Sequence, residues 1–294
     1  SDAALCKSRQ KCNNDIFNNI NSEIITLFPK NKHNNIFAVD GSKFNVPTGF
    51  SKYGYVPRND KAVKNLAMIS CIYNVTNNIP INILLTNHFN ERKSFLCQLT
   101  AFKTKSIFIF DRGYFSLEMV NCISFANHSY LFRLKNDANK QINNIYKNSK
   151  IKDTIIFVNG EKIRIFKYFI DNNIYLCATN LFKYSIKKLS KLYKLKWTVE
   201  EGFKTFKSYL KLNYIRSTTH KLLSQEIIIR QIMFTLSRLL QMEHKSQKIN
   251  PISLKYIIYS NFVLYNHILK SNIKCIYKYI TFKNIPNRKR KCAK

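Results

Sequence analysis

The chain has 294 residues, of which 45% are hydrophobic, so it can bury the core of one large domain. Its 49 Lys and Arg residues outnumber its 16 Asp and Glu residues and leave a formal net charge of +33. A charge of this size favours a polyanionic partner, nucleic acid first, although the codon bias of an AT-rich genome would also supply many lysines. The most apolar stretch, residues 227–240, is interrupted by charges and shorter than the roughly 20 residues of a membrane span, which argues against a membrane protein.

The eight cysteines include no CxxC pair and no Cys/His cluster with zinc spacing. No signal peptide is evident. Both features favour a reducing, intracellular compartment, and we expect a cytoplasmic protein associated with the nucleoid.

Residues 1–35 are polar and rich in Asn, and we expect a short helix or an arm there. The next hundred residues contain short apolar runs rich in Ile, Phe and Tyr, which predict strands at 36–39, 66–73, 79–85, 107–110 and 130–134. Between them, residues 92–104 and 116–126 are predicted helices. Strands with interleaved helices predict a layered α/β domain.

Residues 136–180 differ from what precedes them. Two alternating segments flank Asn159-Gly160, a strong signal for a two-residue hairpin, and predict a β-rich insertion. From residue 185 onward we expect helices near 185–212, 222–245 and 251–270, followed by a basic tail at 288–291. The predicted organisation is an N-terminal arm (1–35), a main domain (36–245) and a helical, basic C-terminal part (246–294).

Three acidic residues carry the chemistry that we predict. Asp40 and Asp111 each follow an apolar run, so each is expected at the end of a strand, and Glu200 lies in the helix after the insertion. Two carboxylates on strand ends and one on a helix can hold two divalent metal ions. Such a pair of ions catalyses the cleavage of phosphodiester bonds. Each aspartate alone could instead start a turn, because both Asp40-Gly41 and Asp111-Arg112-Gly113 are turn-like sequences.

The helix around Glu200 has two adjoining faces. An arc of roughly 60° carries polar residues, and the stripe beside it is apolar. The polar residues are Tyr193, Lys196, Glu200 and Lys207, and the apolar ones are Leu195, Val199, Phe203, Phe206 and Leu210. If the apolar stripe docks on the sheet near the two aspartates, Glu200 reaches the same cavity; an ordinary amphipathic helix with solvated charges is the alternative.

With these residues, the chain resembles the DDE transposases of bacterial insertion sequences, specifically insertion sequence family 4. That family carries a Tyr-x2-Arg-x3-Glu-x6-Lys signature, which aligns with Tyr193, Lys196, Glu200 and Lys207. Residues 36–41 and 110–114 look like its first and second acidic motifs, and Arg216-Ser217 also looks like the family. The resemblance covers roughly residues 36–240.

The resemblance implies an RNase H-like fold with a β-rich insertion before the glutamate helix, and cut-and-paste DNA transposition by metal-dependent hydrolysis and strand transfer. It implies that Asp40, Asp111 and Glu200 are catalytic and hold two Mg²⁺ ions, which Mn²⁺ can replace. It also implies double-stranded DNA as the partner, both transposon ends and target, bound by a homodimer in a synaptic complex. The residues implied in DNA binding are Tyr193, Lys196, Lys207 and Arg216.

Two departures from the family leave other functions open. Lys196 stands where the family has arginine, which keeps the charge but loses the two-pronged contact to phosphate. No DNA-reading domain of family type is visible in residues 1–35, and the chain begins at Ser1 rather than Met. A decayed or domesticated transposase that only binds DNA, and an RNase H-like nuclease without strand transfer, are the alternatives.

Three further residues could have either a structural or a functional role. His88 and Glu91 either belong to a surface loop or touch the active site, and His220 is read as a helix-start residue rather than a catalyst.

Overall fold

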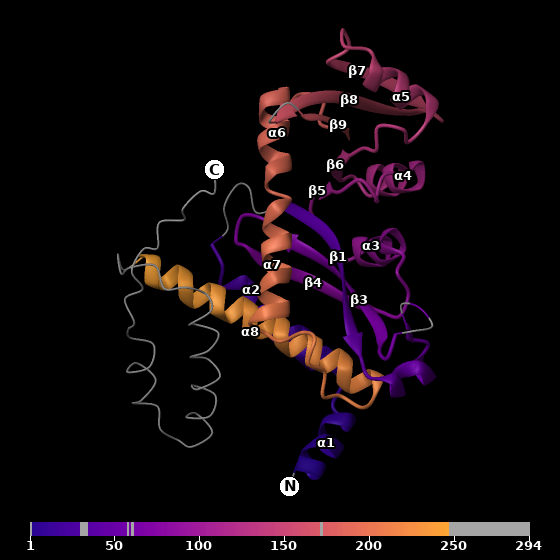
Figure 1. Cartoon of the computed structure of the whole chain (residues 1–294). Helices are drawn as coiled ribbons and strands as arrows, with labels where there is room; N and C mark the ends of the chain where they lie inside the picture. Colours follow the sequence, from indigo (N-terminus) through magenta and orange to yellow (C-terminus); the bar gives the residue numbers. More distant parts are fainter. Residues whose placement is uncertain (1, 30–34, 58, 60–61, 171–172, 247–294) are drawn as a thin grey trace, which may run out of the picture.

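The computed structural model describes residues 2–29, 35–57, 59, 62–170 and 173–246 (Figure 1). Its α-helices are α1 (Asp2–Lys11), α2 (Asn14–Thr26), α3 (Glu91–Leu99), α4 (Leu117–Phe125), α5 (Lys140–Lys147), α6 (Ile186–Lys194), α7 (Trp197–Ser208) and α8 (His220–Ser246). Its strands are β1 (Ile36–Val46), β2 (Val56–Pro57), β3 (Asn65–Asn74), β4 (Ile79–Thr86), β5 (Ile107–Phe110), β6 (Ser129–Arg133), β7 (Asp153–Val158), β8 (Glu161–Ile170) and β9 (Asn173–Thr179), with a 3-10 helix at Thr48–Tyr53. The helix expected at 251–270 and the basic tail lie outside the described residues.

One mixed sheet runs through the described part of the chain. Its strand order is β2-β3-β1-β5-β6-β9-β8-β7, with β4 paired to β3. β1, β5 and β6 are parallel neighbours, whereas β3 pairs antiparallel with both β1 and β4. The predicted mixed α/β architecture is therefore confirmed, with a single central sheet.

Helices cover both faces of this sheet (Figure 1). On one face, Phe95 of α3 and Met119 and Ile123 of α4 are buried in a core with residues of β1, β5 and β6. On the other face, the apolar side of α7 and part of α8 pack against β1 and β3. Close approach of α7 depends on Gly202, because a Cβ atom there would lie 2.8 Å from Cε2 of Tyr73 on β3.

The β-rich insertion extends the main sheet rather than forming a separate one. β9 pairs antiparallel with β6, and β8 and β7 follow outward. The hairpin predicted at Asn159-Gly160 is confirmed: the two residues join β7 to β8 with φ angles of 49° and 84°. Both angles are positive, as a tight hairpin turn of the I′ type requires.

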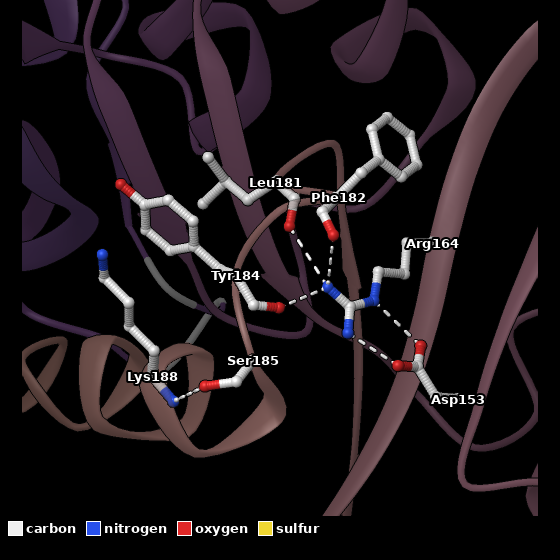
Figure 2. Close-up of polar contacts among 7 residues, drawn as sticks. All are labelled: Asp153, Arg164, Leu181, Phe182, Tyr184, Ser185 and Lys188. Carbon is white, nitrogen blue, oxygen red and sulfur yellow. Dashed lines mark hydrogen bonds and ion pairs between the residues drawn. The ribbon is translucent and has the colours of Figure 1, made fainter.

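A buried arginine fastens the insertion to the helix that leads into the glutamate segment (Figure 2). Arg164 on β8 is 8% exposed and contacts both carboxylate oxygens of Asp153, through Nε at 2.9 Å and Nη2 at 2.6 Å. Its Nη1 donates to the backbone carbonyls of Leu181, Phe182 and Tyr184. These carbonyls belong to the loop that precedes α6, so one guanidinium fixes where α6 begins.

The single helix expected over 185–212 is two helices, and that expectation was wrong in this respect. α6 ends at Lys194 and α7 begins at Trp197, and the bonds Lys196 N to Tyr193 O and Thr198 N to Leu195 O tighten the chain between them into i→i+3 turns. Leu195, predicted to join the apolar stripe, is 37% exposed; the other stripe members, Val199, Phe203, Phe206 and Leu210, are buried as predicted.

Residues 1–35, expected as an arm or short helix, contain α1 and α2, and both pack on α8. Gln225 of α8 donates to the carbonyl of Arg9 at 2.9 Å, and Thr235 donates to the side chain of Asn21 at 3.3 Å. The domain boundaries predicted from the sequence stay a prediction. Within the described residues, no helix combines the length and apolar character needed to cross a membrane.

Candidate active site

Asp40 and Asp111 lie at the same level of two adjacent parallel segments. In the register of β1 with β5, Ala38 stands opposite Ile109, and each aspartate comes two residues later. Asp111 follows the end of β5, as predicted. The expectation for Asp40 was wrong, because β1 continues to Val46 and pairs Asp40 with Cys71 of β3 in mid-strand. Asp40-Gly41 is therefore not a turn.

Both carboxylate oxygens of Asp40 have a partner. Oδ1 accepts a hydrogen bond from the backbone N–H of Gly41 at 2.9 Å. Oδ2 accepts one from the Nζ ammonium of Lys196 at 2.9 Å. Lys196 is 5% exposed, so this contact is a largely desolvated ion pair.

Asp111 is exposed and contacts Tyr193, which lies in the last turn of α6. The hydroxyl of Tyr193, a residue that is 8% exposed, donates to Oδ1 of Asp111 at 3.3 Å. Burial raises the pKa of Tyr193, and the negative charge of Asp111 raises it further. The phenol therefore stays protonated and remains a hydrogen-bond donor.

Glu200 lies half-buried in the first turn of α7. Burial is the largest cause of a raised pKa for Glu200. The ammonium of Lys196 lowers it, whereas the charges of Asp40 and Asp111 raise it. The three acids predicted to act together thus lie near enough for their charges to interact.

The residues expected to bind DNA fall into two groups. Tyr193 and Lys196 point inward and contact the two aspartates. Lys207 is half-buried at the end of α7, and Arg216 is exposed in the loop before α8. That loop is fastened to α8 because Ser217 donates to Glu226 through its hydroxyl at 2.5 Å and its backbone N–H at 3.2 Å.

The donor chemistry of the site fits a hard divalent cation, because carboxylate oxygens are the ligands that Mg²⁺ and Mn²⁺ prefer. In the described residues, no group of three or more Asp, Glu, His or Cys side chains has the spacing that holds a metal ion. The Lys196 ammonium occupies one oxygen of Asp40 and provides a positive charge among the acids.

Of the three residues that could lie in a loop or helix start or in the active site, Glu91 is half-buried at the start of α3. Burial raises its pKa most, and the charge of Asp40 raises it further, so the two carboxyl groups lie near enough to interact. The backbone carbonyl and ring of His88 bond to Thr86 and Asn90, and His220 opens α8 with its ring 3.0 Å from the hydroxyl of Tyr55. The one signal in the sequence for Glu91 was its position at a helix start, beyond the short loop that follows a strand.

The sequence profile of the Transposase DDE domain matches residues 31–236, and the chain belongs to that family. DDE transposases generally use divalent metal ions, which agrees with the acidic site described above. No curated protein sequence matches the chain.

Among solved structures, the chain is similar to the piggyBac transposase in a cryo-EM structure of its synaptic complex with hairpin DNA. The TM-score is 0.53 and the sequence identity is 11%. The similarity covers 86% of this chain and 58% of that chain, so this chain spans little more than half of the piggyBac protein. At this identity the likeness concerns the fold.

Proposed function

We propose that the protein is a DNA transposase of the cut-and-paste type, with an RNase H-like core and with Asp40, Asp111 and Glu200 as its catalytic carboxylates. The observation that supports the proposal is that Asp40 of β1 and Asp111 after β5 follow the same register pair and that their charges raise the pKa of Glu200 on α7. Membership of the DDE family supports the same assignment. The Tyr-Lys-Glu-Lys spacing of the helix segment supports insertion sequence family 4 within it.

The three carboxylates would hold two Mg²⁺ ions, with Mn²⁺ able to replace them. When bound, such ions activate water or a 3′-hydroxyl for attack and stabilise the leaving oxygen of the phosphodiester. The polypeptide contributes the positioning. Tyr193 holds Asp111 by a hydrogen bond, and the backbone N–H of Gly41 holds Asp40.

Duplex DNA, both transposon ends and target, is the proposed substrate, and the nucleoid is the proposed place of action. Lys207 and Arg216 extend the basic surface away from the acids and would contact backbone phosphates. Tyr193 and Lys196 would turn from the aspartates to a phosphate beside the scissile bond. A homodimer in a synaptic complex would bring two ends together.

A second function is favoured by one observation, the ion pair between Lys196 and Asp40. A lysine that neutralises a catalytic carboxylate, at a position where the family has arginine, is consistent with a decayed transposase that binds DNA without cutting it. A nuclease without strand transfer is the other alternative, and it differs in forming no joined products.

The decisive experiment compares the wild type with Glu200→Gln on a DNA substrate that carries the ends flanking the encoding gene, in Mg²⁺ and in Mn²⁺. We expect Glu200→Gln to lower strand cleavage by at least about 1,000-fold and to leave DNA binding within about threefold, because only a metal ligand is removed. The matched control is Glu118→Gln, which changes an exposed carboxylate in the first turn of α4.

Equal inactivity of the wild type and Glu200→Gln in both metals, with DNA binding intact, would overturn the enzyme in favour of the decayed DNA-binding protein. Cleavage by the wild type without any joined strand-transfer product would identify the nuclease instead.

A further inference from the structure

Glu91 is the first residue of α3, and its side chain turns toward the strand that carries Asp40. A Cβ atom built on Gly41 would lie 2.7 Å from Cδ, 2.8 Å from Cγ and 2.8 Å from Oε1 of Glu91. Real Cβ atoms essentially never come this close to another heavy atom, so a larger residue at position 41 would push the flexible Glu91 side chain aside. Position 41 therefore has to be glycine for this carboxyl group to lie beside Asp40.

Neither helix capping nor an ion pair accounts for a carboxyl group at this place. The N-terminus of α3 is already capped, because the Asn90 side chain accepts a hydrogen bond from the N–H of Lys93 at 3.0 Å. Glu91 forms no ion pair with any other described residue. A half-buried acid without an ion-pair partner lowers stability unless something else uses it.

The ammonium group of Lys196 is a cation that the acidic residues of this region already stabilise. It bonds to Asp40, and its charge also lowers the pKa of both Glu91 and Glu200. One positive charge thus lies among three carboxylates from β1, α3 and α7.

A buried hydroxyl faces the same space. Tyr114 is 2% exposed, and its Oη has no hydrogen-bond partner among the described residues. Burial raises the pKa of Tyr114 most, and the charges of Glu91 and Asp40 and a close polar contact with the Glu91 carboxyl group raise it further. The hydroxyl therefore lies within reach of Glu91, although the two do not meet in the geometry of a regular hydrogen bond. An unpaired buried hydroxyl costs free energy, and a ligand entering the site would give it a partner.

The start of α3 is held to the turn that follows Asp111. The guanidinium Nε of Arg92 donates to the backbone carbonyl of Gly113 at 2.9 Å. Within that turn, the N–H of Tyr114 bonds to the carbonyl of Asp111. Glu91 is therefore tied to the segments of both aspartates.

We propose that Glu91 is a fourth acidic residue of the active site and contributes to binding the divalent cation beside Asp40. The inference rests on the proposed function and deepens it, because the metal site would then have four carboxylates instead of the three predicted from the sequence. Gly41 takes part indirectly, since its lack of a side chain admits the Glu91 carboxyl group.

The test is the affinity of the full chain for Mn²⁺, measured by isothermal titration calorimetry without DNA. Glu91→Gln is nearly isosteric, and we expect it to weaken Mn²⁺ binding by about 10-fold or more, on the scale of residues that support a metal site. Glu118→Gln, an acid in the first turn of another helix, should bind like the wild type. Circular dichroism melts establish that each variant is folded.

Gly41→Ala provides an independent variant that removes no charge. It should weaken Mn²⁺ binding in the wild type, because the added methyl group displaces Glu91, and have little further effect in Glu91→Ala. An equal loss in both backgrounds would contradict the placement of Glu91 beside Gly41.

The outcomes separate this inference from the proposed function. If the wild type binds Mn²⁺ and cleaves DNA while Glu91→Gln binds Mn²⁺ equally well, Glu91 is not part of the site and the transposase proposal stands. If the wild type neither binds Mn²⁺ nor cleaves DNA, both fall together.

Discussion

The ammonium nitrogen of Lys196 lies 2.9 Å from Oδ2 of Asp40, although 156 positions separate the two residues in the sequence. The side chain of Lys196 is 6% exposed and that of Asp40 is 22% exposed, so water screens the pair only in part. The contact joins the strand that carries the first acid to the helix segment that carries the third. If Asp40 holds a divalent cation, as we propose, this lysine and the cation compete for the same carboxylate.

Lys196→Met tests that competition. Without metal, the variant should lose about 1–3 kcal/mol of unfolding free energy, less than for a fully buried pair because Asp40 is partly exposed. Mn²⁺ should then raise the melting temperature of the variant more than that of the wild type, because no ammonium has to be displaced. Lys191→Met, at an exposed site on α6, is the control. Equal Mn²⁺ shifts in wild type and variant would show that the ammonium and the metal do not compete.

Gly202→Ala should destabilise the protein even though alanine favours a helix by up to about 1 kcal/mol. The new Cβ would lie 2.8 Å from the ring of Tyr73, which is buried and held by a 2.6 Å hydrogen bond from its hydroxyl to the carbonyl of Asn78. Forcing atoms into a packed core costs about 1–3 kcal/mol, so the net loss should be near 1 kcal/mol or more. Urea denaturation measures it against Gly49→Ala, where no atom lies within 4 Å of the added methyl. A stabilised Gly202→Ala would mean that α7 does not pack this closely on β3.

Arg164→Met should remove the fastening between the insertion and α6. It leaves the Asp153 carboxylate and three backbone carbonyls without their donor, and we expect a loss of about 2–4 kcal/mol in chemical denaturation. The control is Lys204→Met, which removes an ion pair whose side chains are 62% and 50% exposed. Such a surface pair contributes less than about 1 kcal/mol. Similar losses for the two variants would contradict a structural role for Arg164.

Binding to duplex DNA should depend steeply on salt, because the chain carries a formal net charge of +33. Each phosphate that the protein neutralises adds about −0.9 to the slope of log K against log salt concentration. A fluorescence anisotropy titration from about 50 to 200 mM salt measures this slope, and we expect it to be nearly independent of DNA sequence. A slope shallower than about −2 would attribute the charge to codon bias rather than to a DNA partner.

The parts of the molecule that were predictable are those governed by local rules. Apolar runs identified the strands, Asn159-Gly160 identified the hairpin because both residues adopt positive φ, and the spacing of Val199, Phe203 and Phe206 identified the buried face of α7. The order of Asp40, Asp111 and Glu200 along the chain led to their assignment as the acids of a DDE site, which stays a prediction. Periodicity and turn chemistry depend on neighbours in sequence, so the sequence alone determines them.

Tertiary structure decided the rest, because partners distant in sequence leave no periodic signal. Asp40-Gly41 has turn chemistry, yet pairing with β3 keeps it in the middle of β1, since the ladder bonds outweigh a weak local preference. The sequence predicts that Lys196 contacts a DNA phosphate from the polar side of its helix. In the folded chain, the tight turns between α6 and α7 direct its ammonium group onto Asp40. The Glu91 side chain lies against β1 in space that Gly41, with no side chain, leaves open. Such contacts arise from packing in three dimensions, and only the folded chain brings them together.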